Sequence, residues 1–208
     1  MATTDYTRAR RHLARRDPVL RDLMRAHGKC GLAEAQNADP FGALLKAIVS
    51  QQLSTKAAKT IYTRLMALFD GVPTPQGLAR LADDELRAAG LSGQKLRYMR
   101  DLGARVHDGS LPQHALDAMG DEDVIVALTQ VKGIGRWTAE MYLMFRLHRP
   151  DVLPAGDLGI VKAVQKAYGL RKTPSPDRLH EIGEAWRPYR SVACWYLWRS
   201  LNNTPASD

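Results

Sequence analysis

Apolar residues recur every three to four positions along most of the chain, a spacing typical of short amphipathic helices. Residues 40–50 predict a buried helix, with Asp39 as its N-cap and Pro40 at the first helical position. Its apolar stripe consists of Phe41, Leu44, Leu45, Ile48 and Val49. Alternating β-branched runs, which are typical of strands, are lacking. The pattern therefore predicts an all-α protein.

Polar caps, glycines and prolines divide the rest of the chain into further helices. Asp17-Pro18 marks the start of a new helix within residues 5–27, and Gly90 ends a short one capped by Asp83. The other main helices are predicted over residues 54–69, 94–107, 122–129, 159–168, 177–186 and 190–201. Together these signals predict about ten short helices.

The composition is that of a globular protein. The 208 residues fit one domain or two closely packed lobes, with 45% hydrophobic and 25% charged residues. No stretch approaches the roughly 20 apolar residues of a membrane-spanning helix, and no secretory signal precedes the first Arg-rich run. We therefore expect a cytoplasmic protein without membrane contact. The 30 Lys and Arg residues against 22 Asp and Glu favour a polyanionic partner.

Cysteine and histidine usage argues against a metal or disulfide protein. Cys30 and Cys194 are too few for a disulfide framework, a four-cysteine zinc site or an iron–sulfur cluster. We expect both to be reduced thiols. No two of the six histidines are three or four positions apart, so a helical zinc site is not expected.

The most informative segment is LTQVKGIGRWTA at residues 128–139. Gly133 and Gly135 bracket Ile134, a pattern that predicts a helix, a tight turn and a second helix. Glycines let a phosphate approach the backbone closely, and the second helix offers its unpaired N–H groups to that phosphate. By itself, the Gly-Ile-Gly tripeptide also fits an ordinary structural turn.

The residues around these glycines strengthen the nucleic-acid interpretation. VKGIGRWTA at residues 131–139 resembles the helix-hairpin-helix of the DNA base-excision glycosylase superfamily. LPAGDLG at residues 153–159 resembles the Gly/Pro-rich loop that ends in that superfamily's catalytic aspartate, here Asp157. The segments IVSQQLS at 48–54 and GLSGQK at 90–95 occur where the family has its DNA-facing loops.

The C-terminal segment narrows the resemblance to one branch. WRPYRS at residues 186–191, followed by Trp198, resembles the alkylbase glycosylases, the DNA-3-methyladenine glycosylase II family. The resemblance covers roughly residues 39–201. It implies an all-α, two-lobed helix-hairpin-helix fold with the active-site cleft between the lobes. One glycosylase domain would span residues 1–208, with lobe A at about 40–150, its hairpin at 122–146, and lobe B from 1–39 and 151–208.

The same resemblance implies an activity. The protein would act as a monomer on double-stranded DNA, flip out 3-methyladenine or 7-methylguanine and hydrolyse the N-glycosidic bond. The product would be an abasic site, as in base excision repair. Neither an organic cofactor nor a catalytic metal is expected. The family's hairpin does bind a monovalent cation, and a structural Na⁺ or K⁺ is implied at the main-chain carbonyls of Thr129, Val131 and Ile134.

Two residues define the expected chemistry. Bifunctional relatives carry a nucleophilic lysine two residues beyond the second glycine, whereas Trp137 stands there and cannot form a Schiff base. We therefore expect no lyase activity. Asp157 is the one carboxylate that stands out, although glycoside hydrolysis usually needs two. A cationic alkylated base leaves without an acid, so one carboxylate suffices to stabilise the oxocarbenium-like sugar and orient water.

The substrate pocket is expected to be aromatic. Trp137 would stack on the cationic base through cation–π attraction, and Trp198 would form the opposite wall. Tryptophans at helical spacing are often core residues, which is the alternative for both. Met141 stands where related enzymes often carry a tyrosine, which favours a wider and less selective pocket.

The DNA-binding residues fall into three groups. In the hairpin, Gly133, Gly135, Arg136 and Thr138 would contact phosphates. Gln52 and the loop of Leu91, Gly93 and Gln94 would fill the gap left by the flipped base, with Gly93 at the position of the usual bulky wedge and Leu91 or Gln94 as substitutes. Lys95, directly after this loop, would also contact DNA. The N-terminal cluster of Arg8, Arg10, Arg11, Arg15 and Arg16 fits a solvated face, with direct DNA contact as the alternative.

Other functions remain open at this point. A glycosylase of the same fold with another target, an etheno or deaminated base, would differ only in its released product. A non-catalytic DNA-binding member of the family is a second alternative, against which Asp157 argues. An iron–sulfur glycosylase is excluded because the cysteines are missing.

Overall fold

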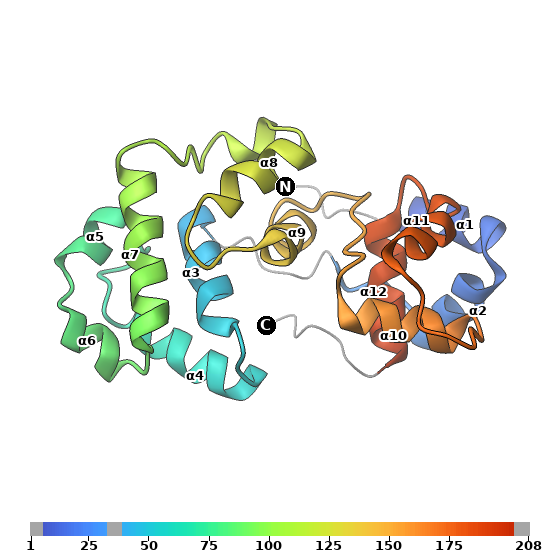
Figure 1. The fold of residues 1–208 in the computed structure, drawn as a ribbon, viewed down its shortest axis with the longest axis horizontal. Coiled ribbons are helices and arrows are strands. Elements are labelled where there is room, and N and C mark those ends of the chain that lie inside the picture. The colour runs from blue at the N-terminus through green and yellow to red at the C-terminus, as the bar shows by residue number, and fades with distance from the viewer. Residues whose placement is uncertain (1–5, 33–38, 202–208) are drawn as a thin grey trace. The chain divides into compact units, whose positions relative to one another are not determined.

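The computed structural model describes residues 6–32 and 39–201, and within these ranges the structure contains twelve α-helices and no strand (Figure 1). The all-α expectation is confirmed. None of the helices in this part of the chain is long and apolar enough to cross a membrane. The helices divide between two compact units. The described residues of unit 1 are 6–32 and 143–201, and those of unit 2 are 39–142.

Unit 2 is built around α3. Its helices are α3 (Pro40–Ser50), α4 (Thr55–Met66), α5 (Pro75–Arg80), α6 (Asp83–Ala88), α7 (Gly93–His107), α8 (Asp121–Thr129) and the first part of α9 (Arg136–Phe145), with the 3₁₀ helix η2 (Leu116–Ala118) before α8. The Asp39 carboxylate accepts the N–H of Gly42 at 2.6 Å, so it caps α3 as predicted. The apolar stripe of α3 is completely buried and packs against α4 and α7.

Unit 1 is built around α12. Its helices are α1 (Thr7–Arg16), α2 (Pro18–His27), α10 (Leu158–Ala167), α11 (Pro176–Glu184) and α12 (Arg190–Ser200). Residues 191–198 of α12 are all buried, because α1, α2 and α10 pack around this helix. A helix that is buried on every side needs apolar residues all round, which explains why α12 has no polar face.

A buried carboxylate joins the parts of unit 1. Asp17 caps α2 by accepting the N–H of Leu20 at 3.0 Å, as the Asp17-Pro18 signal predicts. Its other oxygen accepts hydrogen bonds from the Tyr168 hydroxyl at 2.5 Å and the Trp186 indole at 3.0 Å. Burial and the neighbouring Asp17 carboxylate raise the pKa of Tyr168 far above its ordinary value. Three donors, the Leu20 N–H, the Tyr168 hydroxyl and the Trp186 indole, thus satisfy the Asp17 carboxylate, which is buried away from water.

Candidate functional site

The predicted catalytic aspartate begins α10 in unit 1. Asp157 Oδ1 accepts the backbone N–H of Ile160 at 2.7 Å, which makes Asp157 the N-cap of that helix. The same oxygen accepts the indole N–H of Trp198 at 2.8 Å. The preceding residues Leu153 and Ala155 are buried, whereas Asp157 itself is half-buried. A buried loop, a helix terminus and an indole therefore determine the orientation of this carboxylate.

Trp198 lies on α12 and is only 4% exposed. Its ring stacks on Phe145, with centroids 6.1 Å apart and planes inclined by 29°. Gly159 permits this position, because a Cβ there would lie 3.0 Å from the indole and 2.9 Å from Asp157 Oδ1. The sequence predicted Trp198 as a wall for the substrate base. In the structure the polar edge of its indole holds Asp157, a contact that sequence reasoning missed.

The predicted helix–turn–helix around the glycines is present in unit 2. Gly133 has a φ of +81°, a conformation that favours glycine, and a Cβ there would lie 2.1 Å from the ring of Tyr98. Ile134 is buried, and its N–H bonds the Val131 carbonyl at 3.0 Å. Gly135 accepts the N–H of Ala139 at 3.1 Å and so opens α9. The turn is therefore closed by Ile134, as expected, and covered by an aromatic ring.

Side chains from α7 and from the end of α3 hold this turn. The Asp101 carboxylate accepts the Lys132 N–H at 2.9 Å and the Arg105 guanidinium at 2.9 Å. Burial opposes its charge, but these donors outweigh burial and the pKa of Asp101 is lowered. The Gln51 amide donates to the Gly133 carbonyl at 2.8 Å. The hairpin is thus fixed before any DNA binds.

Lys95 was predicted to contact DNA, and in the structure its ammonium makes hydrogen bonds within the protein. Its ammonium donates to the carbonyls of Val49 at 2.5 Å and Gln51 at 2.8 Å, at the C-terminal end of α3. Burial lowers the pKa of Lys95. A lysine that satisfies the last carbonyls of a helix is a structural cap. Lys95 therefore supports the Gln51 segment, which in turn holds Gly133.

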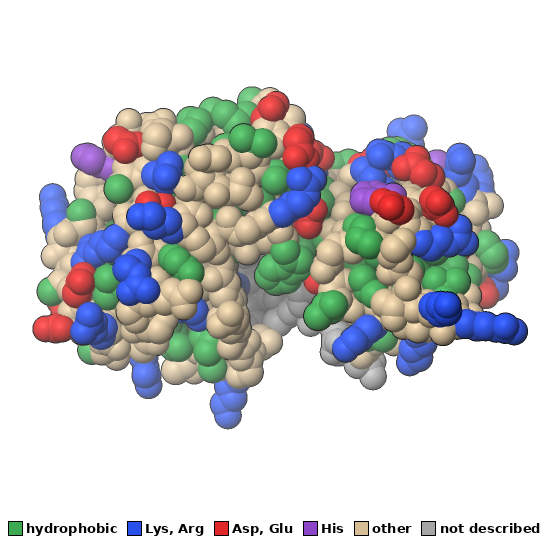
Figure 2. Space-filling view, in the orientation of Figure 1, with side chains coloured by type: hydrophobic (Ala, Val, Ile, Leu, Met, Phe, Trp, Pro, Cys, Tyr) green, Lys and Arg blue, Asp and Glu red, His purple; other side chains and the backbone are tan. Residues whose placement is uncertain are grey.

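Arg136, the predicted phosphate contact, is held by two carboxylates. It makes a two-pronged contact with Glu122 on α8, with both N···O distances 2.9 Å, and it reaches Glu140 on α9 at 3.2 Å. Hydrogen bonding to Glu122 raises the pKa of Arg136. Acidic side chains gather over the beginning of α8 (Figure 2). The contact with Glu122 joins α8 to α9. Because two carboxylates face Arg136, its positive charge is largely balanced within the protein.

The other predicted residues of α9 differ in exposure. The Trp137 side chain is 49% exposed, which suits a residue expected to meet a base. Met141 is half-buried. Thr138 is only 6% exposed, so its side chain does not face solvent.

The residues of the two predicted DNA-facing loops of unit 2 differ in exposure. Leu91 is 4% exposed and belongs to the core, which rules it out as a wedge that must project into DNA. Gly93 starts α7, and the exposed Gln94 donates a hydrogen bond to the Tyr98 hydroxyl. Gln52 is exposed with a φ of +57°, a conformation that is costly for a residue other than glycine. Leu53 beside it is 39% exposed, an apolar side chain at a position that the sequence did not single out.

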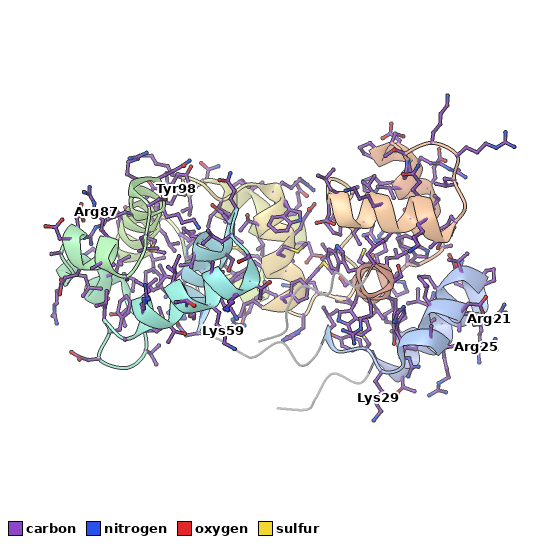
Figure 3. The ribbon with its side chains drawn as sticks, turned by 90° about the horizontal axis from the view of Figure 1, so that it is seen from below. Arg21, Arg25, Lys29, Lys59, Arg87 and Tyr98 are labelled. Carbon is purple, nitrogen blue, oxygen red and sulfur yellow. The ribbon has the colours of Figure 1, made fainter. Side chains whose placement is uncertain are left out.

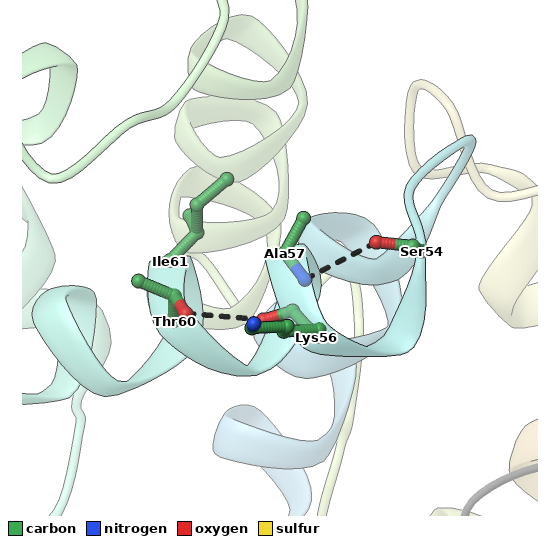
Figure 4. A pocket seen from close by; sticks show the side chains of 5 residues that line it. All are labelled: Ser54, Lys56, Ala57, Thr60 and Ile61. Carbon is green, nitrogen blue, oxygen red and sulfur yellow. Dashed lines mark hydrogen bonds between the residues drawn. The ribbon is translucent and has the colours of Figure 1, made fainter.

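A shallow, open hollow of about 380 Å³ lies at the start of α4. Ser54, Lys56, Ala57, Thr60 and Ile61 line it (Figure 4). Its polar groups serve the helix itself: Ser54 Oγ accepts the Ala57 N–H at 3.3 Å, and the Thr60 hydroxyl donates to the Lys56 carbonyl at 3.0 Å. None of the predicted site residues lines this hollow. Elsewhere, no group of three or more His, Cys, Asp or Glu in the described ranges is arranged for a metal ion.

The chain is similar to a known family of proteins. The chain fits the HhH-GPD superfamily of base excision DNA repair proteins over residues 45–188. Because this match covers more than half of its length, the chain belongs to that superfamily.

Individual relatives are similar over almost the whole chain. DNA-3-methyladenine glycosylase 1 of Schizosaccharomyces pombe is 33% identical over 201 residues, which are 95% of this chain and 88% of that one. The S. pombe 3-methyladenine DNA glycosylase Mag1 in complex with abasic DNA has a TM-score of 0.82 at 32% identity, covering 94% of this chain and 97% of that one. A Bacillus halodurans DNA-3-methyladenine glycosidase has a TM-score of 0.81 at 36% identity, covering 96% and 92%.

Proposed function

We propose that this chain is a monofunctional DNA glycosylase that releases alkylated purines from double-stranded DNA and leaves abasic sites. The observation that carries the proposal is the placement of Asp157. This carboxylate caps α10 and is oriented by the Trp198 indole, within the loop that resembles the catalytic loop of the superfamily. The names of the relatives, 3-methyladenine glycosylases at 32–36% identity, support the choice of alkylated purines.

The geometry of Asp157 suits the proposed chemistry. Two N–H donors converge on Oδ1, so the carboxylate is held in one orientation. The carboxylate also lies at the positive end of the α10 dipole. In the reaction the anion would stabilise positive charge that develops on the sugar as the base departs, and it would orient the attacking water. A 3-methyladenine or 7-methylguanine base is already cationic, so the step does not require an acid.

Trp137 supports both the substrate class and the absence of lyase activity. Its half-exposed ring offers a π face to a cationic base, and this attraction is weaker for a neutral base. Strand cleavage by β-elimination would need an amine nucleophile at this position, and an indole cannot supply one.

The test compares the wild type with Asp157→Asn on a duplex treated with a methylating agent. Released bases are identified by chromatography, and strand breaks are counted before and after alkali. We expect methylpurines from the wild type only, with breaks that appear only after alkali. Release of etheno or deaminated bases in place of methylpurines would change the substrate class. Breaks without alkali would refute the assignment of Trp137.

We also propose that a monovalent cation binds the hairpin carbonyls of Thr129, Val131 and Ile134, and that the protein acts as a monomer. Carbonyl oxygens are suitable donors for such an ion, and the Val131 oxygen, which accepts one N–H, keeps a second lone pair. Exchange of K⁺ for choline at constant ionic strength should then weaken duplex binding several-fold. Unchanged affinity would argue against the ion.

The proposed monomeric state is tested by light scattering, which measures the molar mass in solution.

A further inference from the structure

The positive charge of the chain is concentrated near its beginning. Residues 6–32 contain eight Lys and Arg but only two Asp, a net charge of +6, whereas the whole chain carries +8. The remaining 181 residues are thus almost balanced. Exposed members of this group are Arg8, Arg11, Arg15 and Arg16 on α1, Arg21 and Arg25 on α2, and Lys29 just after it.

The two acidic residues of this segment do little to neutralise its surface. Asp17 is buried, and Tyr168 and Trp186 donate to its carboxylate, so it does not face the arginines. Asp22 is exposed and lies 3.4 Å from Arg21 and 3.7 Å from Arg25. Exposed ion pairs of this kind are weak and easily exchanged for another anion.

The exposed basic residues form stripes along their helices. Arg8, Arg11 and Arg15 are spaced three and four positions apart and share one face of α1. Arg21, Arg25 and Lys29 follow α2 and the segment after it on the outside of unit 1 (Figure 3). A step of four residues in a helix advances about 6 Å, close to the rise of two nucleotides along one DNA strand, about 7 Å.

Helix stability does not explain these stripes. Like charges three or four positions apart on one helix repel each other. Arg15 and Arg16 in the last turn of α1 interact favourably with the helix dipole, but Arg8 in the first turn does not. An anionic partner that runs along the helices would remove the repulsion.

The hairpin of unit 2 does not supply an equivalent charge. Residues 121–140 contain four Asp and Glu against two Lys and Arg. One of the two, Arg136, is held by Glu122 and Glu140. Backbone N–H groups of the hairpin remain suited to a single phosphate, but long-range attraction to a polyanion has to come from elsewhere.

We propose that the basic surface of α1 and α2, made of Arg8, Arg11, Arg15, Arg16, Arg21, Arg25 and Lys29, is the main non-specific contact of this chain with the phosphate backbone of duplex DNA. This inference rests on the duplex substrate proposed above. The surface holds the protein on undamaged DNA while lesions are sought, and it takes no part in cleaving the glycosidic bond. Contacts with phosphates alone carry no sequence information, which suits a protein that surveys all DNA.

The experiment measures binding to a short undamaged duplex by fluorescence anisotropy between about 50 and 200 mM salt. One variant combines Arg8→Gln, Arg11→Gln and Arg15→Gln, and a second combines Arg21→Gln, Arg25→Gln and Lys29→Gln. The matched control removes three exposed arginines of unit 2 by Arg64→Gln, Arg80→Gln and Arg87→Gln; Arg87 lies on α6 (Figure 3). All three variants, the two on α1 and α2 and the control, lose three positive charges each.

We expect each α1 or α2 variant to bind at least about tenfold more weakly at 0.1 M salt. Each lost phosphate contact makes the negative slope of log K against log salt shallower by about 0.9. In the control variant the slope should change by less than the value of about 0.9 that one phosphate contact contributes. Single-turnover excision, with enzyme in excess over damaged duplex and at a saturating concentration, should stay at the wild-type rate. Replacement of the same arginines by lysine should restore the slope, which separates loss of charge from loss of folding.

Wild-type slopes in both the α1 and α2 variants would overturn the inference, and so would an equal loss in the control. Failure of the proposed function has a different signature. A wild type that binds undamaged DNA with the expected salt dependence but releases no methylpurine would refute the activity and leave the basic surface intact.

Discussion

The hydrogen bond between Trp198 and Asp157 offers the sharpest test of the proposed mechanism. Trp198→Phe keeps an aromatic ring beside Phe145 and Gly159 but removes the N–H that lies 2.8 Å from Asp157 Oδ1. The Ile160 N–H at 2.7 Å remains, so Oδ1 keeps one of the two donors described above and loses the other.

The expected magnitude follows from the charge on the acceptor. A hydrogen bond to a charged group contributes about 1.5–3 kcal/mol. If that energy serves to hold Asp157 in its reactive orientation, the excision rate falls by about 10- to 150-fold. The smaller ring also leaves a gap in the core of unit 1, which we expect to cost about 1–2 kcal/mol of unfolding free energy.

The assay is single-turnover excision with enzyme in excess over methylated duplex, combined with binding to an abasic-site duplex. The rate of excision should fall while affinity for the abasic duplex stays within about threefold. Trp195→Phe is the matched control, because Trp195 is a buried tryptophan of the same helix that packs edge-on against Tyr196. The control should lose similar stability and keep its rate. Equal rates in the Trp198 variant and the wild type would refute the orienting role.

Three further predictions concern stability. Gly133→Ala should lower the free energy of unfolding by at least about 2 kcal/mol and weaken duplex binding, because φ is +81° and the new Cβ meets the ring of Tyr98. The control Gly135→Ala places its Cβ in open space and should cost under about 1 kcal/mol; urea titrations measure both. Asp17→Ala should cost about 2–4 kcal/mol because it orphans buried donors, and the melting temperature should fall far more than for the exposed Asp22→Ala. Burial raises the pKa of Tyr196 to about 12, so the folded state keeps a proton that the unfolded chain releases near pH 10. The unfolding free energy should therefore fall as pH rises from about 10 to 12, and less steeply in Tyr196→Phe.

Local signals in the sequence were sufficient for several features. The apolar period placed the helices, because one face of each must be buried. Asp39 and Asp17 cap helices as expected, because an N-cap acts on N–H groups two or three residues away. The glycine turn, and the tryptophan in place of a lysine at position 137, could also be identified from the sequence, since both depend on residue type at fixed spacing.

Long-range contacts decided the roles of the polar side chains. Lys95 caps a helix whose end lies more than forty positions away, and Arg136 meets Glu122 on the preceding helix. The sequence predicted DNA contacts for both, because a basic residue near glycines is typical of a phosphate site. Leu91 belongs to the core although its loop resembles an exposed wedge. Such partners depend on how helices pack, which no local pattern reports.

Sequence alone determined that the chain is helical, that its hairpin lacks the lyase nucleophile and that Asp157 is its foremost candidate for catalysis. The tertiary structure decided which side chain orients that carboxylate and which arginines of α1 and α2 are exposed. The physical reason is the range of the interactions. Helix period and capping act within one or two turns, whereas the bond from Trp198 to Asp157 spans 41 positions and exists only because α10 packs on α12.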